Sequence, residues 1–412
     1  MDRDNTSGLC SGSDGCLVAI FTRSGGSSGG QKQSLAVSND DGETWTDYPG
    51  NPVLTNPGST AFRDPKVFWH QPTERWVMVV SARDRIQIYV SPNLIDWELA
   101  SELPLGESVN GVLECPDLFE LPLEGGGGET RWVLKVDANP GPIIGFSKAW
   151  YLTGTFDGRR FVPDSAALAP VEWGADFYAA QSWNGIDRDR RVWIAWMANW
   201  KYALSMPTDP WRGAMTVPRE VGLVAVRGAL TLTQRPAAEF DALHRSRILS
   251  AHDAPVAEGA RRLAKQSPDA FDLVLEVELG GASRIQLDPR ASGDQRTSVV
   301  YDGSAHQLIL DRSASGASGF DRTFAVRHAA PLDLDPSTGT LALRVLVDWS
   351  SVGVFAANGT VVLTDLVFPG PASKSLALSS EGGAPRITTL TLDEMATIWS
   401  EGEERTPSIR ID

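Results

Sequence analysis

Three polar turns, each leading into an aromatic residue, recur along the first half of the chain and constrain the fold more than any other feature. They are Ser38–Trp45, Ser91–Trp97 and Thr155–Phe161. A repeat of about fifty residues built from short strands is typical of a β-propeller, whose sheets pack radially and bury such aromatic side chains between them. We therefore expect the three aromatic residues to pack between neighbouring sheets.

Short apolar runs, separated by Gly, Pro, Asn and Asp, extend from about residue 17 to residue 234. Residues 16–21, 76–80 and 191–196 are examples. No convincing amphipathic helix interrupts them, which disfavours a parallel α/β sheet and predicts an all-β region.

The pattern changes after Gln234. Residues 235–243 are typical of a short helix or linker, and the alternating segments 271–279 and 340–348 predict antiparallel strands with one buried face. A β-sandwich is the natural arrangement for such strands. We predict a propeller over 1–234, a linker over 235–248, a sandwich over 249–400 and a loose charged tail over 401–412.

Charge and composition exclude several functions. A net charge of −15 and a pI near 4.9 argue against a nucleic-acid partner, because phosphate binding needs clustered Lys and Arg. No apolar run is long enough to cross a membrane. The five histidines are scattered without ligand-type spacing, so neither a metal nor another cofactor is expected: His70, His244, His252, His306 and His328.

The three cysteines do not predict a disulfide framework. Cys10 and Cys16 lie close enough in a loop rich in Gly and Ser to form a small local bridge. Cys115 then remains a thiol, and since no histidine-centred constellation surrounds it, we interpret it as a small buried apolar residue.

Two acidic motifs point to carbohydrate chemistry. They are Phe62-Arg63-Asp64-Pro65 and Leu113-Glu114-Cys115-Pro116-Asp117, both set among strand-like runs. Glycoside cleavage generally uses two carboxyl groups that flank the scissile bond. A proline shortly after each acidic residue stiffens the backbone and helps to fix the direction of the carboxylate.

These motifs, with residues 173–180 and 196–200, resemble glycoside hydrolase family 32, the β-fructofuranosidases. The resemblance continues through residues 210–219 and reaches 348–355, so it spans nearly the whole chain. Among the members of this family, the chain is most similar to exo-acting inulinases and levanases, which release terminal fructose from fructans.

The resemblance implies a five-bladed propeller with a central site, followed by a β-sandwich, and a mechanism that retains anomeric configuration. It implies that Glu114 is the general acid and base, and that Asp64 stabilises the transition state by accepting hydrogen bonds from the fructosyl hydroxyls. Arg63 is expected to influence the protonation of these carboxyl groups by its positive charge.

Further implied substrate-binding positions are Asp176, Trp196, Trp200 and Cys115, of which the two indoles offer flat apolar walls to a sugar. The resemblance also implies an extracellular location and a fructan or sucrose substrate.

One departure from the family pattern concerns the nucleophile. The family carries it in a Trp-Met-Asn-Asp-Pro-Asn-Gly type motif, which occurs nowhere in this sequence. Asp2 and Asp4 are poor substitutes, because they lie in a polar terminus without a following proline or a rigid strand. We expect an N-terminally incomplete chain with an incomplete first blade and little or no activity alone.

Two other functions remain open. Residues 38–45 match the Asp-box turn of sialidase propellers, but that turn indicates architecture and not chemistry, and a sialidase needs an Arg triad and a Tyr nucleophile. Alternatively, the chain binds fructan without turnover, which the missing nucleophile favours.

Overall fold

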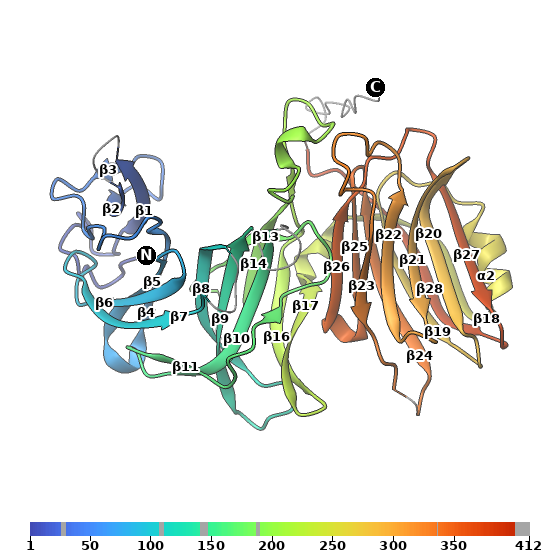
Figure 1. Ribbon diagram of the computed structural model, residues 1–412, viewed down its shortest axis with the longest axis horizontal. Helices are drawn as coiled ribbons and strands as arrows, with labels where there is room; N and C mark the ends of the chain where they lie inside the picture. Colours follow the sequence, from blue (N-terminus) through green and yellow to red (C-terminus); the bar gives the residue numbers. More distant parts are fainter. Residues whose placement is uncertain (26–29, 107–110, 141–146, 187–189, 336, 400–412) are drawn as a thin grey trace. The chain divides into compact units, whose positions relative to one another are not determined.

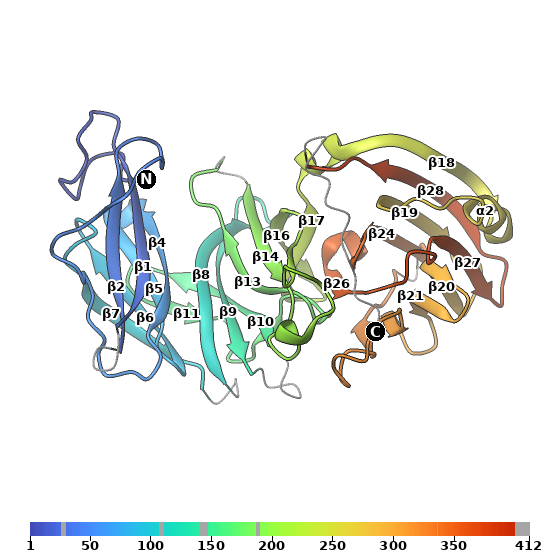
Figure 2. The same ribbon diagram turned by 90° about the horizontal axis from the view of Figure 1, so that it is seen from above.

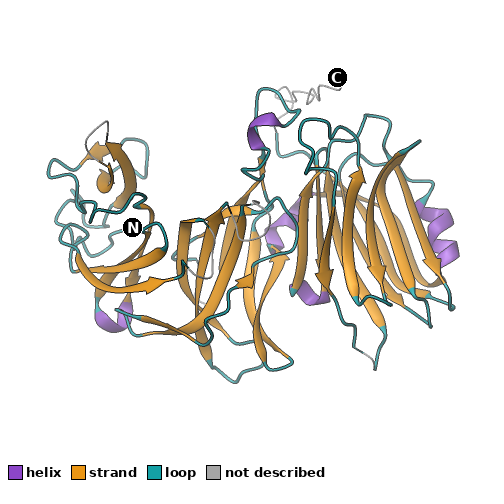
Figure 3. Cartoon of the chain, in the orientation of Figure 1, coloured by secondary structure: helices purple, strands orange, loops and turns teal. Residues whose placement is uncertain are grey.

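The computed structural model describes residues 1–25, 30–106, 111–140, 147–186, 190–335 and 337–399. Strands dominate these residues and the helices are short, as Figure 3 shows, which confirms the predicted all-β class. The chain divides into two compact units. Unit 1 comprises residues 1–171 and 179–189, and unit 2 comprises residues 172–178 and 190–412. The predicted tail lies outside the described residues.

Unit 1 is built mainly from three antiparallel sheets (Figure 1). The first has β1 (Leu17–Gly25), β2 (Gly30–Ser38) and β3 (Thr46–Asp47). The second has β4 (Arg63–His70), β5 (Arg75–Ser81), β6 (Arg85–Ser91) and β7 (Glu98–Pro104), with the 3-10 helix η1 (Gln71–Thr73) between β4 and β5. The third has β8 (Val112–Pro122), β9 (Thr130–Asn139), β10 (Lys148–Phe156), β11 (Phe161–Pro163) and β12 (Ala169–Pro170).

The second sheet is buried on both faces, as strand β5 illustrates. Val77 and Val79 belong to a core cluster shared with β8, β9 and β10. Met78 and Val80 point the other way and pack in a cluster that includes Phe62. Because alternate residues of a strand face opposite sides, a run of apolar residues is what a sheet between two layers requires.

The strand β13 (Tyr178–Ser182) carries the boundary between the units. Unit 2 then continues with β14 (Arg191–Met197), η2 (Ala203–Ser205), β15 (Ala214–Met215), β16 (Arg219–Val226) and β17 (Ala229–Pro236). β16 pairs with both β14 and β17, and β15 pairs with β14. Beyond β17 lies the 3-10 helix η3 (Ala238–Leu243), within the segment predicted to be a short helix or linker.

Two facing sheets complete unit 2 and confirm the predicted sandwich (Figure 2). One has the order β18-β28-β19-β24-β25-β26, formed by His244–Pro255, Arg386–Met395, Phe271–Glu278, Thr340–Asp348, Ser351–Ala356 and Val361–Leu366. The other has the order β23-β22-β21-β20-β27, formed by Arg327–Pro331, Gln307–Ala314, Gln295–Asp302, Arg284–Ser292 and Ser375–Glu381.

A single apolar core joins these two sheets. Leu273 and Leu343 from one sheet and Leu287 and Leu308 from the other are among its members. The short helix α2 (Val256–Leu263), which the sequence did not predict, packs against β18 and β27, and the 3-10 helix η4 (Ala357–Gly359) links β25 to β26. Among the described residues, no helix has the length and apolar character that a membrane span requires.

The aromatic repeat is only partly as predicted. Trp97 and Phe161 pack in core clusters, but Trp45 is 47% exposed, so the expectation that it is buried between sheets was wrong. Its indole N–H donates to the Gly42 carbonyl, and the following strand β3 has only two residues, which leaves the ring at the surface. Asp40 accepts hydrogen bonds from the amide and hydroxyl of Thr44, so the Asp-box segment is a structural turn.

Candidate functional site

The two acidic motifs occupy the same kind of irregularity in two successive sheets. In the β4–β5 pair the register shifts between Arg63 and Lys66, and in the β8–β9 pair it shifts between Glu114 and Asp117. Each shift is a β-bulge, in which one strand carries an extra residue and re-aims its side chains. The second and third sheets of unit 1 therefore present their motifs in equivalent ways.

Each bulge contains a residue with left-handed backbone followed by proline. Asp64 has φ +64° and Cys115 has φ +46°, and neither is glycine. Such residues are strained by about 1–3 kcal/mol and concentrate at functional sites. Pro65 and Pro116 come next, and a bulge tolerates proline because its missing N–H interrupts no ladder there.

Contacts across the two bulges bring together four of the predicted site residues. Arg63 Nη2 donates to Glu114 Oε1 at 2.7 Å, and Arg63 Nε lies 3.9 Å from Asp64 Oδ2. The backbone N–H of Cys115 donates to Asp64 Oδ2 at 3.0 Å. The side chains of Arg63, Asp64 and Glu114 are 24%, 29% and 16% exposed, so the group is accessible and not walled off by apolar packing.

The surroundings of Asp64 shift the pKa of its carboxyl group in opposite directions. Burial raises the pKa of its carboxyl group above the usual value, and the negative charge of Glu114 adds to this, whereas the Cys115 amide and Arg63 oppose it. Burial also raises the pKa of the Cys115 thiol, which supports its interpretation as an unreactive residue. Cys115 contributes to the group by donating to Asp64 Oδ2, from its backbone N–H at 3.0 Å and from its thiol at 3.7 Å.

Three polar residues of the first sheet hold the Asp64 bulge from the other side, and the sequence analysis missed them. Thr22 Oγ1 accepts the Asp64 N–H at 3.0 Å and donates to Gln33 Oε1 at 2.9 Å. Gln31 Oε1 accepts the Phe62 N–H at 2.8 Å. The signal that could have found them is the pair of glutamines at alternate positions of β2, which places both on one face.

Two buried Lys–Asp pairs lie behind the bulges. Lys66 Nζ lies 3.3 Å from Asp117 Oδ2, and the same oxygen accepts the Ser182 N–H at 2.8 Å. Lys135 pairs with Asp137, and both side chains are fully buried. Buried charges are retained only when they are paired and hydrogen-bonded, so these pairs fix the strands that carry the motifs.

Asp176, a predicted substrate contact, lies in unit 2 and is fully buried there. Its Oδ2 is 2.6 Å from Arg312 Nη1, and its carboxylate also accepts hydrogen bonds from Tyr202 Oη and the Leu366 N–H. These contacts give Asp176 a structural role within unit 2, because they engage both of its oxygens and argue against direct contact with a sugar.

Trp196 and Trp200, the other predicted contacts in unit 2, form a tilted pair with ring centroids 4.9 Å apart. Trp200 is 48% exposed and Trp196 is partly exposed. Aromatic faces of this kind can stack on the apolar face of a sugar.

The N-terminal aspartates do not resemble a nucleophile. Asp2 is buried and accepts hydrogen bonds from the amides and hydroxyls of Thr6 and Ser7. Burial alone would raise the pKa of Asp2, but these hydrogen bonds lower that pKa below its usual value. Asp4 lies exposed in the same turn-rich segment. Asp2 therefore closes a turn, and its lack of a catalytic role stays a prediction.

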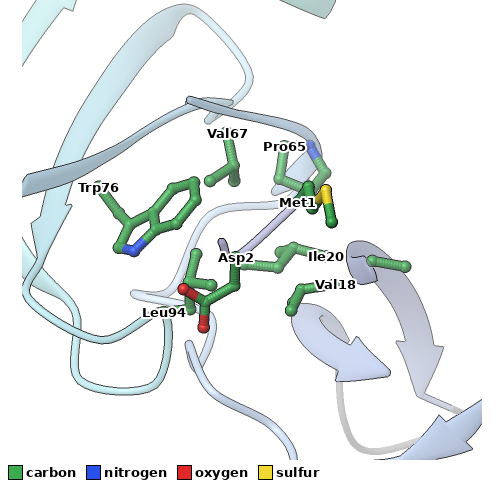
Figure 4. A pocket seen from close by; sticks show the side chains of 9 residues that line it. Met1, Asp2, Val18, Ile20, Pro65, Val67, Trp76 and Leu94 are labelled. Atoms are coloured by element: carbon green, nitrogen blue, oxygen red, sulfur yellow. The ribbon is translucent and has the colours of Figure 1, made fainter. Parts of the chain in front are cut away.

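A pocket of about 260 Å³ lies beside Asp2 in unit 1 (Figure 4). Eight of its nine lining residues are apolar, and Figure 4 shows the Trp76 and Leu94 side chains around it. Pro65, the neighbour of Asp64, is also part of its wall. Cys10 and Cys16 form the local disulfide that their spacing allowed, with the sulfurs 2.14 Å apart, and Cys16 is paired with Asp2 in an isolated bridge.

One cluster with metal-ligand chemistry appears that the spacing of the histidines did not reveal. His244, Asp241 and Asp272 bring ligand atoms within 4.8 Å of one another in unit 2. Arg344 already places its guanidinium there, with Nη2 2.6 Å from both Asp241 and Asp272. The positive charge that such a carboxylate pair requires is thus supplied by the chain itself.

Comparisons with known proteins identify the family of the chain. The sequence profile described as glycosyl hydrolases family 32 N-terminal domain matches residues 2–236, and that of the family 32 C terminal matches residues 239–399. A levanase of Bacillus subtilis (strain 168) is 40% identical over 97% of this chain and 60% of its own length. A levanase of Bacillus sp. (strain L7) is 37% identical, with 46% of its length covered. The chain thus spans less than two thirds of these two relatives.

The extracellular exo-inulinase of Aspergillus awamori is 38% identical over 90% of this chain and 72% of its own length. A crystal structure of exo-inulinase from the same organism superposes with a TM-score of 0.86, at 35% identity, over 97% of this chain and 83% of that one. The fold class is accordingly a β-propeller followed by a β-sandwich, while the number of blades stays a prediction. On the profiles and relatives together, the chain belongs to glycosyl hydrolases family 32.

Proposed function

We propose that this chain recognises the terminal fructosyl residue of a fructan or of sucrose, and that Glu114 and Asp64 serve a retaining β-fructofuranosidase reaction. The observation that carries the proposal is the pair of accessible carboxyl groups joined by Arg63, each at a strained bulge. Levanases and exo-inulinases among the relatives support the substrate class.

We assign the roles by the resemblance to the family. Glu114 donates a proton to the leaving oxygen as the glycosidic bond breaks, and it later removes a proton from the attacking water. Asp64 accepts hydrogen bonds from fructosyl hydroxyls, which strengthen as the ring gains oxocarbenium character. Arg63 orients Glu114 through the bond to Oε1 and reduces the repulsion between the two carboxylates.

The substrate contacts in unit 2 are Trp196 and Trp200, whose partly exposed rings offer flat apolar walls. Cys115 contributes through its backbone N–H and its thiol, which both donate to Asp64 Oδ2. We further propose that the protein acts outside the cell, as the names of its exo-inulinase relatives state for those proteins. The Cys10–Cys16 disulfide supports this location, because disulfides persist in oxidising compartments.

A specific observation also favours a second function, fructan binding without turnover. No Asn-Asp-Pro sequence occurs among the 412 residues. The carboxylate of Asp2 accepts hydrogen bonds from the amides of Thr6 and Ser7 in its turn. No residue of this chain is therefore assigned as the attacking carboxylate. We expect the 412-residue chain to release little or no fructose from inulin or levan.

Chemical rescue, in which added azide replaces the missing nucleophile of the chain, tests the proposed function. In the presence of azide and sucrose, the anomeric C–O bond breaks, Glu114 gives its proton to the leaving oxygen and azide forms the new C–N bond. We expect fructosyl azide with inverted configuration from the folded chain, and a loss of at least tenfold in its rate with Glu114→Gln. Asp393→Asn, in the sandwich, is the control variant.

The outcomes separate the candidates. Fructosyl azide that depends on Glu114 supports the catalytic assignment. Saturable binding of inulin without any azide product favours the binding protein. Full fructose release by the chain without azide contradicts the expectation that no nucleophile is present, and cleavage of a sialoside in place of sucrose contradicts the substrate class.

A further inference from the structure

The buried residue Asp137 lies directly opposite Glu114 in the third sheet of unit 1. The register of β8 and β9 pairs Glu114 with Asp137, immediately before the bulge. Residues directly opposite in an antiparallel pair place their side chains on the same face, with Cβ atoms about 4.5–5.5 Å apart. A second carboxyl group therefore stands beside the proposed acid, on the inner side of the strand.

Lys135, two residues before Asp137, connects this carboxyl group to the backbone of the bulge. Its Nζ donates to the Cys115 carbonyl at 3.1 Å, to the Ala180 carbonyl at 2.8 Å and to Asp137 Oδ2. Both Lys135 and Asp137 are fully buried. One ammonium group thus ties together the strand that carries Glu114, the segment at Ala180 and the buried carboxylate.

The other oxygen of Asp137 is not used by this network. Asp137 Oδ1 is buried and makes no hydrogen bond of good geometry among the described residues, although the Ala179 backbone N–H lies close enough to lower the pKa of this carboxyl group. Leaving a buried polar atom without a well-formed hydrogen bond costs about 1–3 kcal/mol.

We propose that Lys135 and Asp137 are positioning residues for Glu114, with Lys135 fixing the bulge through the Cys115 carbonyl and Asp137 interacting electrostatically with the acid across the strand pair. This inference rests on the proposed function, because it assumes that Glu114 acts as an acid. It adds two residues that do not touch the substrate and act through another side chain.

The charged groups around Asp137 support the coupling. Burial raises the pKa of Asp137 to about 7, Lys135 lowers it, and the Glu114 carboxylate raises it. Glu114 and the Cys115 thiol lie on β8, and Arg63 and Asp64 lie beyond them on β4.

Carbon-13 NMR of aspartate carboxyl groups in the full chain tests this without any turnover. The Asp137 signal is identified by its loss in Asp137→Asn, and its titration is followed in the wild type and in Glu114→Gln. We expect the Asp137 midpoint to fall by at least about 0.5 pH units in Glu114→Gln, since an adjacent charge shifts a pKa by about 1–3 units. Glu120→Gln, at an exposed position of the same strand, is the matched control and leaves the midpoint in place.

An unchanged midpoint in Glu114→Gln overturns the proposal. If that variant does not fold, the wild type decides, because an Asp137 midpoint below about 5 would mean an ordinary carboxylate without coupling. Lys135→Met gives a second readout and is expected to raise the midpoint. Since these measurements need no substrate, a chain that fails the azide experiment but passes them disproves the proposed function and leaves the proton coupling standing.

Discussion

Single side chains at the site are held by polar contacts from more than one sheet. Asp64 receives the Cys115 N–H from the third sheet, while its own N–H is accepted by Thr22 from the first. A left-handed residue that is not glycine persists only when its surroundings fix it from several sides. The direction of the Asp64 carboxylate is therefore set by three sheets of unit 1 together.

Thr22→Val tests this support at the scale of one residue. Valine keeps the shape of threonine but leaves the Asp64 N–H without its acceptor, so we expect a loss of about 1–3 kcal/mol in the free energy of unfolding. Urea denaturation measures it. Thr155→Val, at an exposed position of β10, is the control and should stay within about 0.5 kcal/mol of the wild type. Equal stability of the two variants would show that Thr22 does not support the bulge.

The buried carboxyl of Asp137 predicts a pH dependence of stability. Its pKa is raised from 3.8 to about 7 in the folded chain. Between these two values the folded state binds more protons than the unfolded state, so this group makes stability fall as pH rises. Asp137→Asn should remove roughly 2–4 kcal/mol of that fall between pH 4 and pH 7.5. Urea denaturation at both pH values checks it, and parallel behaviour of variant and wild type would refute it.

At the scale of elements, the repeated bulge explains why two different motifs can serve one site. The Arg63 to Lys66 and Glu114 to Asp117 segments share a register shift, a left-handed residue and a proline. The sequence alone indicated the prolines and the acidic residues. It could not indicate the shift, because a bulge becomes visible only when the partner strand is known.

Strand positions were predicted well where local patterns decide them. The predicted segment 340–348 coincides with β24, and 76–80 lies within β5. The interpretation failed at Trp45, which remains exposed because tertiary contacts decide its burial. Tertiary contacts also hold Asp176 in the interior through Arg312, which the sequence could not indicate. The sequence analysis did not identify Lys135 and Asp137 as buried residues, because alternating polar residues in a strand usually face water.

The segment that enters unit 2 at residues 172–178 makes a second prediction at this scale. A Cβ on Gly174 would come within 2.3 Å of the backbone N and O of Thr364 in β26. Backbone atoms cannot move aside cheaply, so Gly174→Ala should destabilise the protein by about 1–3 kcal/mol or more. Gly319→Ala, where a Cβ meets no atom within 4 Å, is the control. A thermal melting temperature that is unchanged in Gly174→Ala would contradict this packing.

At the scale of the whole molecule, the two units carry different features. Unit 1 holds the carboxyl groups with Arg63, and unit 2 holds the exposed tryptophan pair and the sandwich. The domain boundary predicted from the sequence, with the propeller ending at 234 and the sandwich starting at 249, differs from the division into two compact units and stays a prediction. Its linker is tied to the sandwich by Arg344, which bonds to Asp241 of η3 and Asp272 of β19.

The central claim is that Asp64 and Glu114 bind the same terminal fructosyl residue. Calorimetric titration of the intact chain with a short inulin-type oligosaccharide tests this claim most directly. We expect saturable binding that weakens at least tenfold in Asp64→Asn, because the carboxylate accepts hydrogen bonds from the sugar hydroxyls, and that is unchanged in Asp393→Asn. Equal affinity of Asp64→Asn and the wild type, or no binding by a folded wild-type chain, would contradict the account.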